Sequence, residues 1–378
     1  MINLYKKTNL QQKINKLKII TKFKYLIVIL STLAFACDST LQDRKTEVTF
    51  TKQFTALIAL DSIEITKPIF KARRITTNND FLFVLESDPN ELVKIFDVIT
   101  GEYLHSFGKE GSGPEEILKP SSSGFVTFED NLVITDLKTV TFYNIKYDSN
   151  HQYLNIKSTN KIRIPGSLIP LNFATPFNDS TIYGTTQSSL KHFSIFNKKS
   201  EIDYQFGNYP NYFPSVVDKA KWYAYQNLSA IKPDRTKIAV VYQNLPLIRI
   251  FDKEGNIVKD SWIKSKKKQK EFTLLSISNV SIDPNGLVSY FHDVQSNDEY
   301  IVALFDEIIH EVSSTGELKR NKISKRKLIV LDWDGNAMLE LILEDWMRLY
   351  TISPKGNLFF LHPEKSNTLY SLELNNLK

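Results

Sequence analysis

The sequence predicts an all-β fold, a six-bladed β-propeller of four-stranded antiparallel blades whose ring is closed by an N-terminal strand. Two observations support this prediction. After residue 47 the chain consists of short runs rich in Ile, Val, Phe, Tyr and Thr, interrupted by Asn, Asp, Gly and Pro, which is the pattern of strands and turns. Two kinds of turn each recur six times and alternate along the chain. Repeats of about four strands each are typical of β-propellers.

The first kind of turn joins two strands, as in "IFDVITGEYLHSF" from Ile95 to Phe107. The residues that open it are Asp97, Asn144, Asn197, Asp252, Asp332 and Ser371. The second kind leads into an apolar strand, mostly at intervals of about 50 residues, near Asp80, Asp130, Asp179, Asp234, Asn285 and Lys355. Each repeat then holds two hairpins with two apolar faces, which it can bury only against neighbouring repeats. Closure into a ring leaves no exposed end unit.

Ring closure requires a strand from the N-terminal side of the first repeat. The segment "EVTFTKQFTALIAL", Glu47 to Leu60, precedes that repeat, and the last repeat ends soon after "LYSLEL". We therefore expect Glu47 to Leu60 to supply the outer strand of the last blade.

The fifth repeat is longer than the others. Its two turns, near Asn285 and Asp332, lie 47 residues apart, against 14 to 18 residues in the other repeats. This predicts an insertion of about 30 residues, at roughly Ser296 to Lys325. A long insertion between blade strands lies on a propeller face, and loops on rigid scaffolds often carry function.

Residues 1–36 predict an export signal, because seven lysines and no acidic residue precede or flank an apolar run of 12 residues, Tyr25 to Ala36. That run is too short to span a bilayer as a helix. The only cysteine, Cys37, follows at once, and "LAFAC" resembles a lipobox. We expect a lipid on Cys37, a polar tether over residues 37–47, the propeller over 48–378, and an outer-membrane lipoprotein of the cell envelope. The alternative is a secreted protein cleaved after Ala36 with a free thiol.

The positive net charge does not predict a nucleic-acid partner. Seven of the 48 Lys and Arg residues lie in the signal, so the remainder nearly balance the 42 acidic residues, and no strong positive field is left. Two basic runs, Lys264 to Lys270 and Lys319 to Lys327, lack interleaved aromatic residues. They are either solvated loops or a contact for an anionic partner such as lipid head groups. With no cysteine after Cys37, a buried core must stabilise the fold.

The glycine-rich stretch "GKEGSGPEE", Gly108 to Glu116, matches neither the dinucleotide-binding nor the P-loop spacing. It lies between two repeats and is expected to be a blade-to-blade connection. The segments "IFDVITGEYLHSFGKEGSGPEEI" and "LSAIKPDRTKIAVVYQNLPLIRIFDKEGNIV" resemble those of TolB-like six-bladed propeller lipoproteins of Bacteroidetes type. Ile117 stands where that family usually has Phe, and Arg235 where it often has Gly. The resemblance implies an outer-membrane or periplasmic lipoprotein with a binding role and identifies no functional residues.

An aromatic-rich connection, Tyr209 to Tyr225, either packs beneath a loop or offers rings that stack on a glycan or clamp an extended peptide. Its candidate binding residues are Tyr209, Tyr212, Phe213, Trp222, Tyr223 and Tyr225. The sequence thus predicts a lipid-anchored module that binds a peptide, protein or glycan, without catalysis, metal or cofactor.

The alternative is a metal-dependent hydrolase or lyase with its site at the mouth of the central channel. Polar residues at the ends of expected strands are candidates for such a site: Glu86, Ser87, Asp88, Asp136, His292 and Asp293. The six histidines show no metal-ligand spacing, and no nucleophile-elbow motif is present. Metal analysis of the purified domain would separate the two functions.

Overall fold

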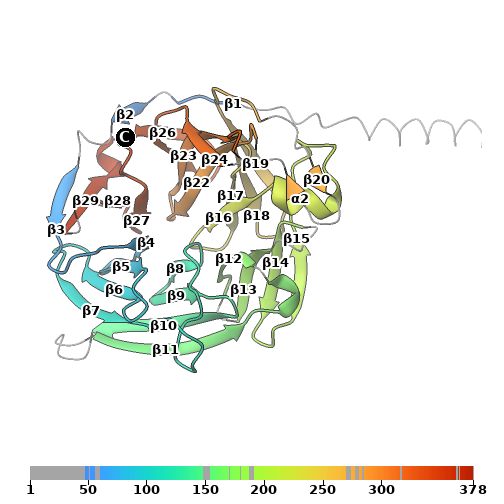
Figure 1. Ribbon diagram of the computed structural model, residues 1–378. Coiled ribbons are helices and arrows are strands. Elements are labelled where there is room, and N and C mark those ends of the chain that lie inside the picture. Colours follow the sequence, from blue (N-terminus) through green and yellow to red (C-terminus); the bar gives the residue numbers. More distant parts are fainter. Residues whose placement is uncertain are drawn as a thin grey trace, which may run out of the picture. The chain divides into compact units, whose positions relative to one another are not determined.

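The computed structural model describes residues 47–377, except for 51, 56–59, 148–153, 170, 179, 187–190, 270–273, 277–280, 283–284, 316, 363–364 and 366. These residues belong to one compact unit, Thr46–Lys378. Its strands form six blades arranged radially around an axis (Figure 1). The predicted six-bladed propeller is confirmed. The predicted signal peptide, the lipid attachment at Cys37 and the tether up to residue 46 lie outside the described residues.

Each blade has four antiparallel strands, and we number the blades 1 to 6 in chain order from Ala72. The first strands of the blades line the axis: β4 (Ala72–Thr77), β8 (Phe125–Phe128), β12 (Leu171–Pro176), β16 (Asn227–Ile231), β22 (Val288–Ser296) and β27 (Leu349–Ile352). The second strands are β5 (Phe81–Glu86), β9 (Asn131–Thr135), β13 (Thr181–Thr186), β17 (Lys237–Tyr242), β23 (Tyr300–Val312) and β28 (Asn357–Leu361). The third are β6 (Val93–Asp97), β10 (Thr139–Tyr147), β14 (Phe193–Asn197), β18 (Leu247–Asp252), β25 (Lys327–Asp332) and β29 (Thr368–Glu373). The fourth are β7 (Tyr103–Phe107), β11 (Leu154–Arg163), β15 (Ile202–Phe206), β19 (Ile257–Ile263), β26 (Ala337–Ile342) and β3 (Asp61–Glu64).

The few remaining elements lie between or beside the blades. They are a two-stranded sheet of β20 (Leu274–Ser276) and β21 (Ser281–Ile282), the 3₁₀ helices η2 (Gly166–Leu168) and η3 (Leu374–Leu377), and the helix α2 (Asp218–Ala224). None of the helices in the described part of the chain has the length and apolar character needed to cross a bilayer.

Alternation along the strands explains why the blades must pack side by side. In β5, Phe81, Phe83 and Leu85 point to blade 2, whereas Leu82 and Val84 point to blade 6, because successive side chains of a strand face opposite sides. The buried hydrophobic residues that the structure describes divide into six clusters, one at each interface between neighbouring blades. The core is therefore a ring of interfaces, and the axis is left for other groups.

An N-terminal strand closes the ring, as predicted, but it is not the predicted segment. β3 pairs with β29 to complete blade 6, and it begins one residue after Leu60. The earlier residues form β1 (Glu47–Val48) and β2 (Gln53–Thr55), which add parallel fifth strands to blades 4 and 5. The assignment of Glu47 to Leu60 to blade 6 was wrong because these residues also have strand-forming composition, and composition does not specify the partner strand.

The extra residues of blade 5 lie further along the chain than predicted. Ile301 to Phe305 pair with both β22 and β25, so they belong to the blade's own second strand. The true extension is a hairpin, in which the rest of β23 pairs with β24 (Leu318–Lys322). The turn predicted near Asn285 precedes the first strand of the blade. The turn between the first two strands is formed at Asn297. Its side chain accepts hydrogen bonds from the backbone N–H groups of Glu299 (3.0 Å) and Tyr300 (2.8 Å).

The turns between third and fourth strands follow local side-chain chemistry. Asp97, for example, accepts hydrogen bonds from the backbone N–H groups of Ile99 (2.9 Å) and Thr100 (2.8 Å), which is the usual role of Asp in a turn. Asn197, Asp252 and Asp332 do the same. Asn144 and Ser371, predicted to open such turns, instead lie within β10 and β29.

Two observations explain those errors. β10 and β11 are the long arms of one hairpin and pair continuously past Asn144, and β29 receives its outer partner from the N-terminal β3. The second turn series is confirmed at Asp80, Asp130, Asp234 and Lys355, each of which lies between the first and second strands of its blade. Asp179 lies outside the described residues.

Candidate ligand-binding cavity on the propeller axis

The first strands of all six blades enclose a cavity on the axis. Its inner part, the inner cavity, has a volume of about 100 Å³ and is lined by residues of β4, β8, β12, β16, β22 and β27. The outer cavity, of about 370 Å³, opens at the end where first strands turn into second strands. Six residues line both parts: Thr77, Thr127, Ile231, Arg235, Ser296 and Ile352. The two parts therefore form one continuous axial cavity.

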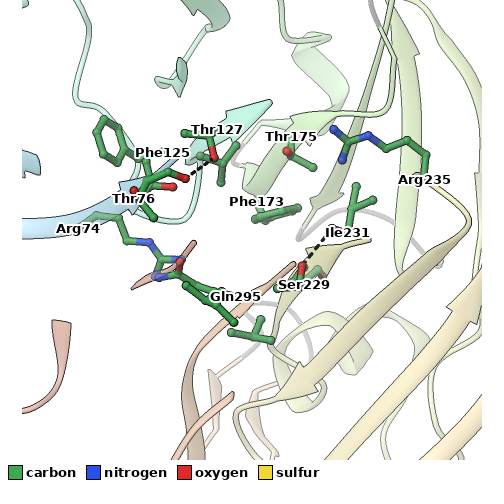
Figure 2. Close-up of a pocket in the computed structure, with 16 residues that line it drawn as sticks. Arg74, Thr76, Phe125, Thr127, Phe173, Thr175, Ser229, Ile231, Arg235 and Gln295 are labelled. Atoms are coloured by element: carbon green, nitrogen blue, oxygen red, sulfur yellow. Dashed lines mark hydrogen bonds between the residues drawn. The ribbon is translucent and has the colours of Figure 1, made fainter. Parts of the chain in front are cut away.

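The inner cavity holds a buried ion pair between two blades. Arg74 of β4 forms an ion pair with Asp293 of β22, and its side chain lies on one side of the hollow in Figure 2. Burial alone would lower the pKa of Arg74, but the attraction of Asp293 outweighs it and the pKa is raised. Asp293 thus neutralises Arg74 within the chain. The hydroxyl of Thr127, in the same lining, is also used internally, since it donates to the carbonyl of Thr77 (3.1 Å).

The rim of the outer cavity is acidic. The turns after β4, β8 and β22 carry Asp80, Glu129 and Asp298, which we call the rim acids, and all three are exposed. No ion pair joins the rim acids to another group in the part of the chain that the structure describes. Asp130, beside Glu129, differs, because it lies 3.5 Å from the ammonium of Lys146. The rim therefore presents negative charge that no direct ion pair among the described residues neutralises.

One cation reaches into this acidic mouth. Arg235 lies in the turn after β16 and has a left-handed backbone, with φ of 64°. Its guanidinium lies 4.4 Å from the ring centroid of Phe128 at the end of β8. The side chain therefore extends from blade 4 past blade 3 to blade 2, pointing toward Thr175 in Figure 2. It lines both parts of the cavity and lies at the boundary between them.

In the part of the chain that the structure describes, Arg235 has no partner of opposite charge in direct contact. Among the described residues, none forms a hydrogen bond or an ion pair with its guanidinium. Burial lowers the pKa of Arg235 to about 10, and the more distant charges of Glu129, Asp234 and Asp298 offset this only in part. The geometry leaves the edge of a planar cation, which carries its N–H donors, available to a ligand.

The aromatic connection predicted as a binding surface contributes largely to the core. Phe213 and Tyr225 are 2% and 1% exposed, and the hydroxyl of Tyr225 accepts hydrogen bonds from the backbone N–H groups of Tyr212 (3.1 Å) and Phe213 (2.9 Å). These two buried rings cannot contact a ligand in this conformation. The other four candidates are partly exposed: Tyr209, Tyr212, Trp222 and Tyr223. A binding role for those four stays a prediction.

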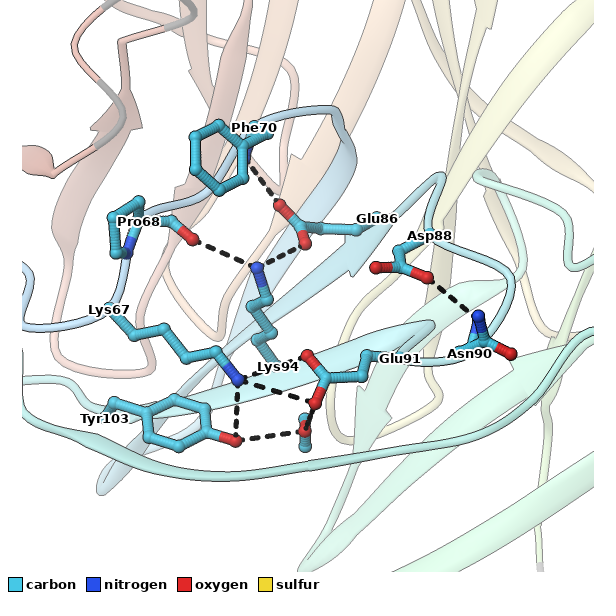
Figure 3. Close-up of polar contacts among 10 residues, drawn as sticks. Lys67, Pro68, Phe70, Glu86, Asp88, Asn90, Glu91, Lys94 and Tyr103 are labelled. Carbon is cyan, nitrogen blue, oxygen red and sulfur yellow. Dashed lines mark hydrogen bonds and ion pairs between the residues drawn. The ribbon is translucent and has the colours of Figure 1, made fainter.

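The carboxylates proposed for an enzymatic site are engaged in structural contacts. Glu86 is 2% exposed, lies 2.6 Å from the ammonium of Lys94 and accepts a hydrogen bond from the backbone N–H of Phe70 (2.8 Å; Figure 3). Asp136 accepts hydrogen bonds from the backbone N–H groups of Lys138 and Thr139 (both 2.7 Å).

The other members of that predicted set are also separated. Ser87 donates its backbone N–H to the carbonyl of Lys71, and Asp88 accepts from the backbone N–H of Asn90. His292 pairs with Asp306 at 2.6 Å. Asp293 is the member of the set that contacts a residue of the cavity lining, Arg74. Within the described ranges no group of three or more His, Cys, Asp or Glu side chains is placed to hold a metal ion.

The fold brings the two basic runs together beside blade 5. Glu307 of β23 is 2% exposed, and its carboxylate accepts hydrogen bonds from the hydroxyl of Ser265 (3.0 Å) and the backbone N–H groups of Lys266 (2.7 Å) and Lys267 (3.2 Å). Lys266 in turn donates to the carbonyl of Ile323 (3.2 Å). An anionic partner for this surface stays a prediction.

The fold and the axial cavity define a six-bladed propeller with a polar, ligand-sized cavity at one mouth. The model of the TolB-like six-blade propeller family matches residues 49–354, and the chain belongs to this family. This confirms the resemblance seen in the sequence.

Two solved structures are similar along nearly their whole length. One is a member of the DUF4221 family from Bacteroides vulgatus, with 12% identity, a TM-score of 0.53, and coverage of 87% of this chain and 98% of that chain. The other is a putative exported protein from Bacteroides fragilis, with 13% identity, a TM-score of 0.53, and coverage of 85% and 98%. At these identities the likeness concerns the fold. No curated protein matches the chain.

Proposed function

We propose that this protein is a lipid-anchored propeller of the cell envelope that binds a peptide, protein or glycan at the mouth of its axial cavity and does not catalyse a reaction. The observation that carries the proposal is Arg235, a cation held in an outer cavity of about 370 Å³ without a partner of opposite charge among the described residues. Pockets of this size with a few placed polar groups are typical ligand sites.

The envelope address is supported by the sequence of the N-terminus and by the putative exported protein from Bacteroides fragilis that shares the fold. A lipid on Cys37 would hold the propeller at the membrane surface through the tether. Replacing Cys37 by Ser is expected to move the protein from the membrane fraction to the soluble fraction of cells. Unchanged recovery with membranes would contradict lipid anchoring.

The binding site can be tested in intact cells with a photo-crosslinking residue. Benzoylphenylalanine at Asn79, an exposed residue of the outer cavity, is expected to capture a ligand. The matched control places it at Tyr204, which is 46% exposed on an outer strand. Mass spectrometry of the adducts would identify the ligand. Equal capture at both positions, or none at Asn79, would contradict a site at the mouth.

A further inference from the structure

The backbone of Arg235 is unusual for its residue type. A left-handed conformation costs a non-glycine residue about 1–2 kcal/mol, yet Arg235 adopts a φ of 64°. Four non-glycine residues in the described part of the chain have positive φ, and two of them, Glu129 (φ 50°) and Arg235, line the outer cavity. Strained residues concentrate at functional sites, and glycine would fit this turn without strain.

The surroundings of Arg235 indicate which ligand group it could bind. Its guanidinium lies over the ring of Phe128, and among the described residues no acceptor takes up its N–H donors. The hydroxyls of Thr127 and Ser296, which line the same region, already donate to the backbone carbonyls of Thr77 and Ile231. A guanidinium edge matches the two oxygens of a carboxylate. Arg235 is therefore a charged donor, at the boundary of the two parts of the cavity, for an anionic group.

The rim acids restrict the ligand further. A ligand with only negative charge would be repelled by Asp80, Glu129 and Asp298, and a ligand with only positive charge would be repelled by Arg235. A ligand with a carboxylate at one end and an ammonium at the other satisfies both regions.

We propose that Arg235 binds the terminal carboxylate of a short peptide whose ammonium group lies against the rim acids. This deepens the proposed function and rests on it. Arg235 is the specificity-determining contact because it binds the free C-terminal carboxylate. The rim acids attract the ammonium group at the other end of the peptide.

Trialanine with free ends is the probe, compared with its C-terminal amide and its N-acetylated form by isothermal titration calorimetry on the purified full-length protein. Charge-assisted hydrogen bonds of this kind correspond to about a tenfold to hundredfold change in affinity. Amidation is expected to weaken binding by that factor, and Arg235→Gly is expected to weaken binding of the free peptide equally. Combining both changes should add little, because they remove one contact. N-acetylation and Asp298→Asn should show the same non-additivity.

Arg235→Lys keeps the charge without the planar fork and should fall between wild type and Arg235→Gly. The matched control is Lys119→Gly, which also removes one positive charge and relieves a non-glycine residue of a positive φ (53°), at an exposed position outside the cavity lining. It should leave binding unchanged. The inference is overturned if trialanine does not bind wild type, or if Arg235→Gly binds the free peptide as wild type does. The crosslinking residue at Asn79 separates this inference from the proposed function. If it captures a ligand equally well with and without Arg235→Gly, the inference fails and the proposed function stands. If it captures nothing even when Arg235 is intact, the proposed function is refuted.

Discussion

Two arginines of blade 4 differ in whether a carboxylate of the fold neutralises their charge. Arg249 of β18 is 2% exposed, and its guanidinium contacts both oxygens of Asp260 on β19, at 2.6 Å each. Arg235, in the turn after β16, rests on Phe128 and contacts no carboxylate among the described residues. The charge of Arg249 is neutralised by a carboxylate of its own sheet, whereas Arg235 lines the axial cavity without such a contact.

The comparison distinguishes charges that stabilise the fold from charges that are available to a ligand, according to whether an oppositely charged side chain contacts them. Lys94 and Glu86 behave like Arg249 and Asp260, because both are buried and lie 2.6 Å apart. Charges of that kind stabilise the fold only as pairs. A charge at the cavity mouth that lacks a partner is free to bind a ligand, and removing it should change stability little.

The largest loss of stability is expected from breaking the buried pair of Arg249. Arg249→Leu leaves Asp260 without its partner, and loss of one member of a buried pair costs about 3–5 kcal/mol in the free energy of unfolding. Urea unfolding measures this. The double variant Arg249→Leu/Asp260→Leu should recover most of the loss. A loss below about 1 kcal/mol for the single variant would show that the pair is not the structural element inferred here.

A smaller loss is expected at the second buried pair. Lys94→Met leaves Glu86 without its cation, but Met fills the space of the lysine stem and Glu86 keeps its hydrogen bond from Phe70. We expect a loss of about 2–3 kcal/mol, measured in urea. The matched control is Lys67→Met, which breaks a pair with Glu91 whose side chains are 33% and 41% exposed. That change should stay within about 1 kcal/mol, and equal effects at both sites would contradict the distinction.

The environment of Arg249 also predicts a dependence of stability on pH. Burial lowers the pKa of His192 well below 6.5, and the charge of Arg249 lowers it further. His192 is 1% exposed and hydrogen-bonds to the hydroxyl of Tyr242 (2.8 Å). The unfolded chain therefore binds a proton near pH 6.5 that the folded chain excludes. Stability is fully present above pH 6.5 and falls as the pH decreases below it, toward about 1.4 kcal/mol per pH unit.

Urea unfolding between pH 7 and pH 5 tests this prediction. His192→Gln should remove most of the slope, whereas His105→Gln, at an exposed residue of β7, should preserve it. In Arg249→Leu the decline should level off at a higher pH, because the folded-state pKa of His192 is then less depressed. A slope that survives in His192→Gln would assign the effect to other groups.

The sequence could predict the blades because their turns depend on local chemistry. Asp97 and Asp252 bind the backbone of their own turns, so a strand and turn pattern suffices to locate them. The turn at Asn297 was missed because "SNDE" lacks glycine and proline, whereas "DPNG" at Asn285 has both. The pairing of Glu47 to Leu60 was misassigned because it depends on which sheet edge is free, which local pattern does not contain.

The cavity could not be predicted in the same way. The contact between Arg235 and Phe128 joins residues more than a hundred positions apart, and it depends on the width of the ring. The one signal in the sequence was Arg235 itself, at a turn position where the resembling family often has glycine. In the structure, the side chain of Arg235 extends from blade 4 to Phe128 of blade 2.

The smallest change in stability is expected at Arg235 itself. Arg235→Gly relieves a left-handed backbone, a gain of about 1 kcal/mol, and loses a stacking contact with Phe128 of about 0.5–1 kcal/mol. The net change in the free energy of unfolding should therefore lie within about 1 kcal/mol of zero. Lys119→Gly relieves a similar backbone without losing a stack, so it should be the more stable of the two by about the stacking energy. A loss of about 3 kcal/mol or more in Arg235→Gly would place Arg235 with Arg249 as a structural cation.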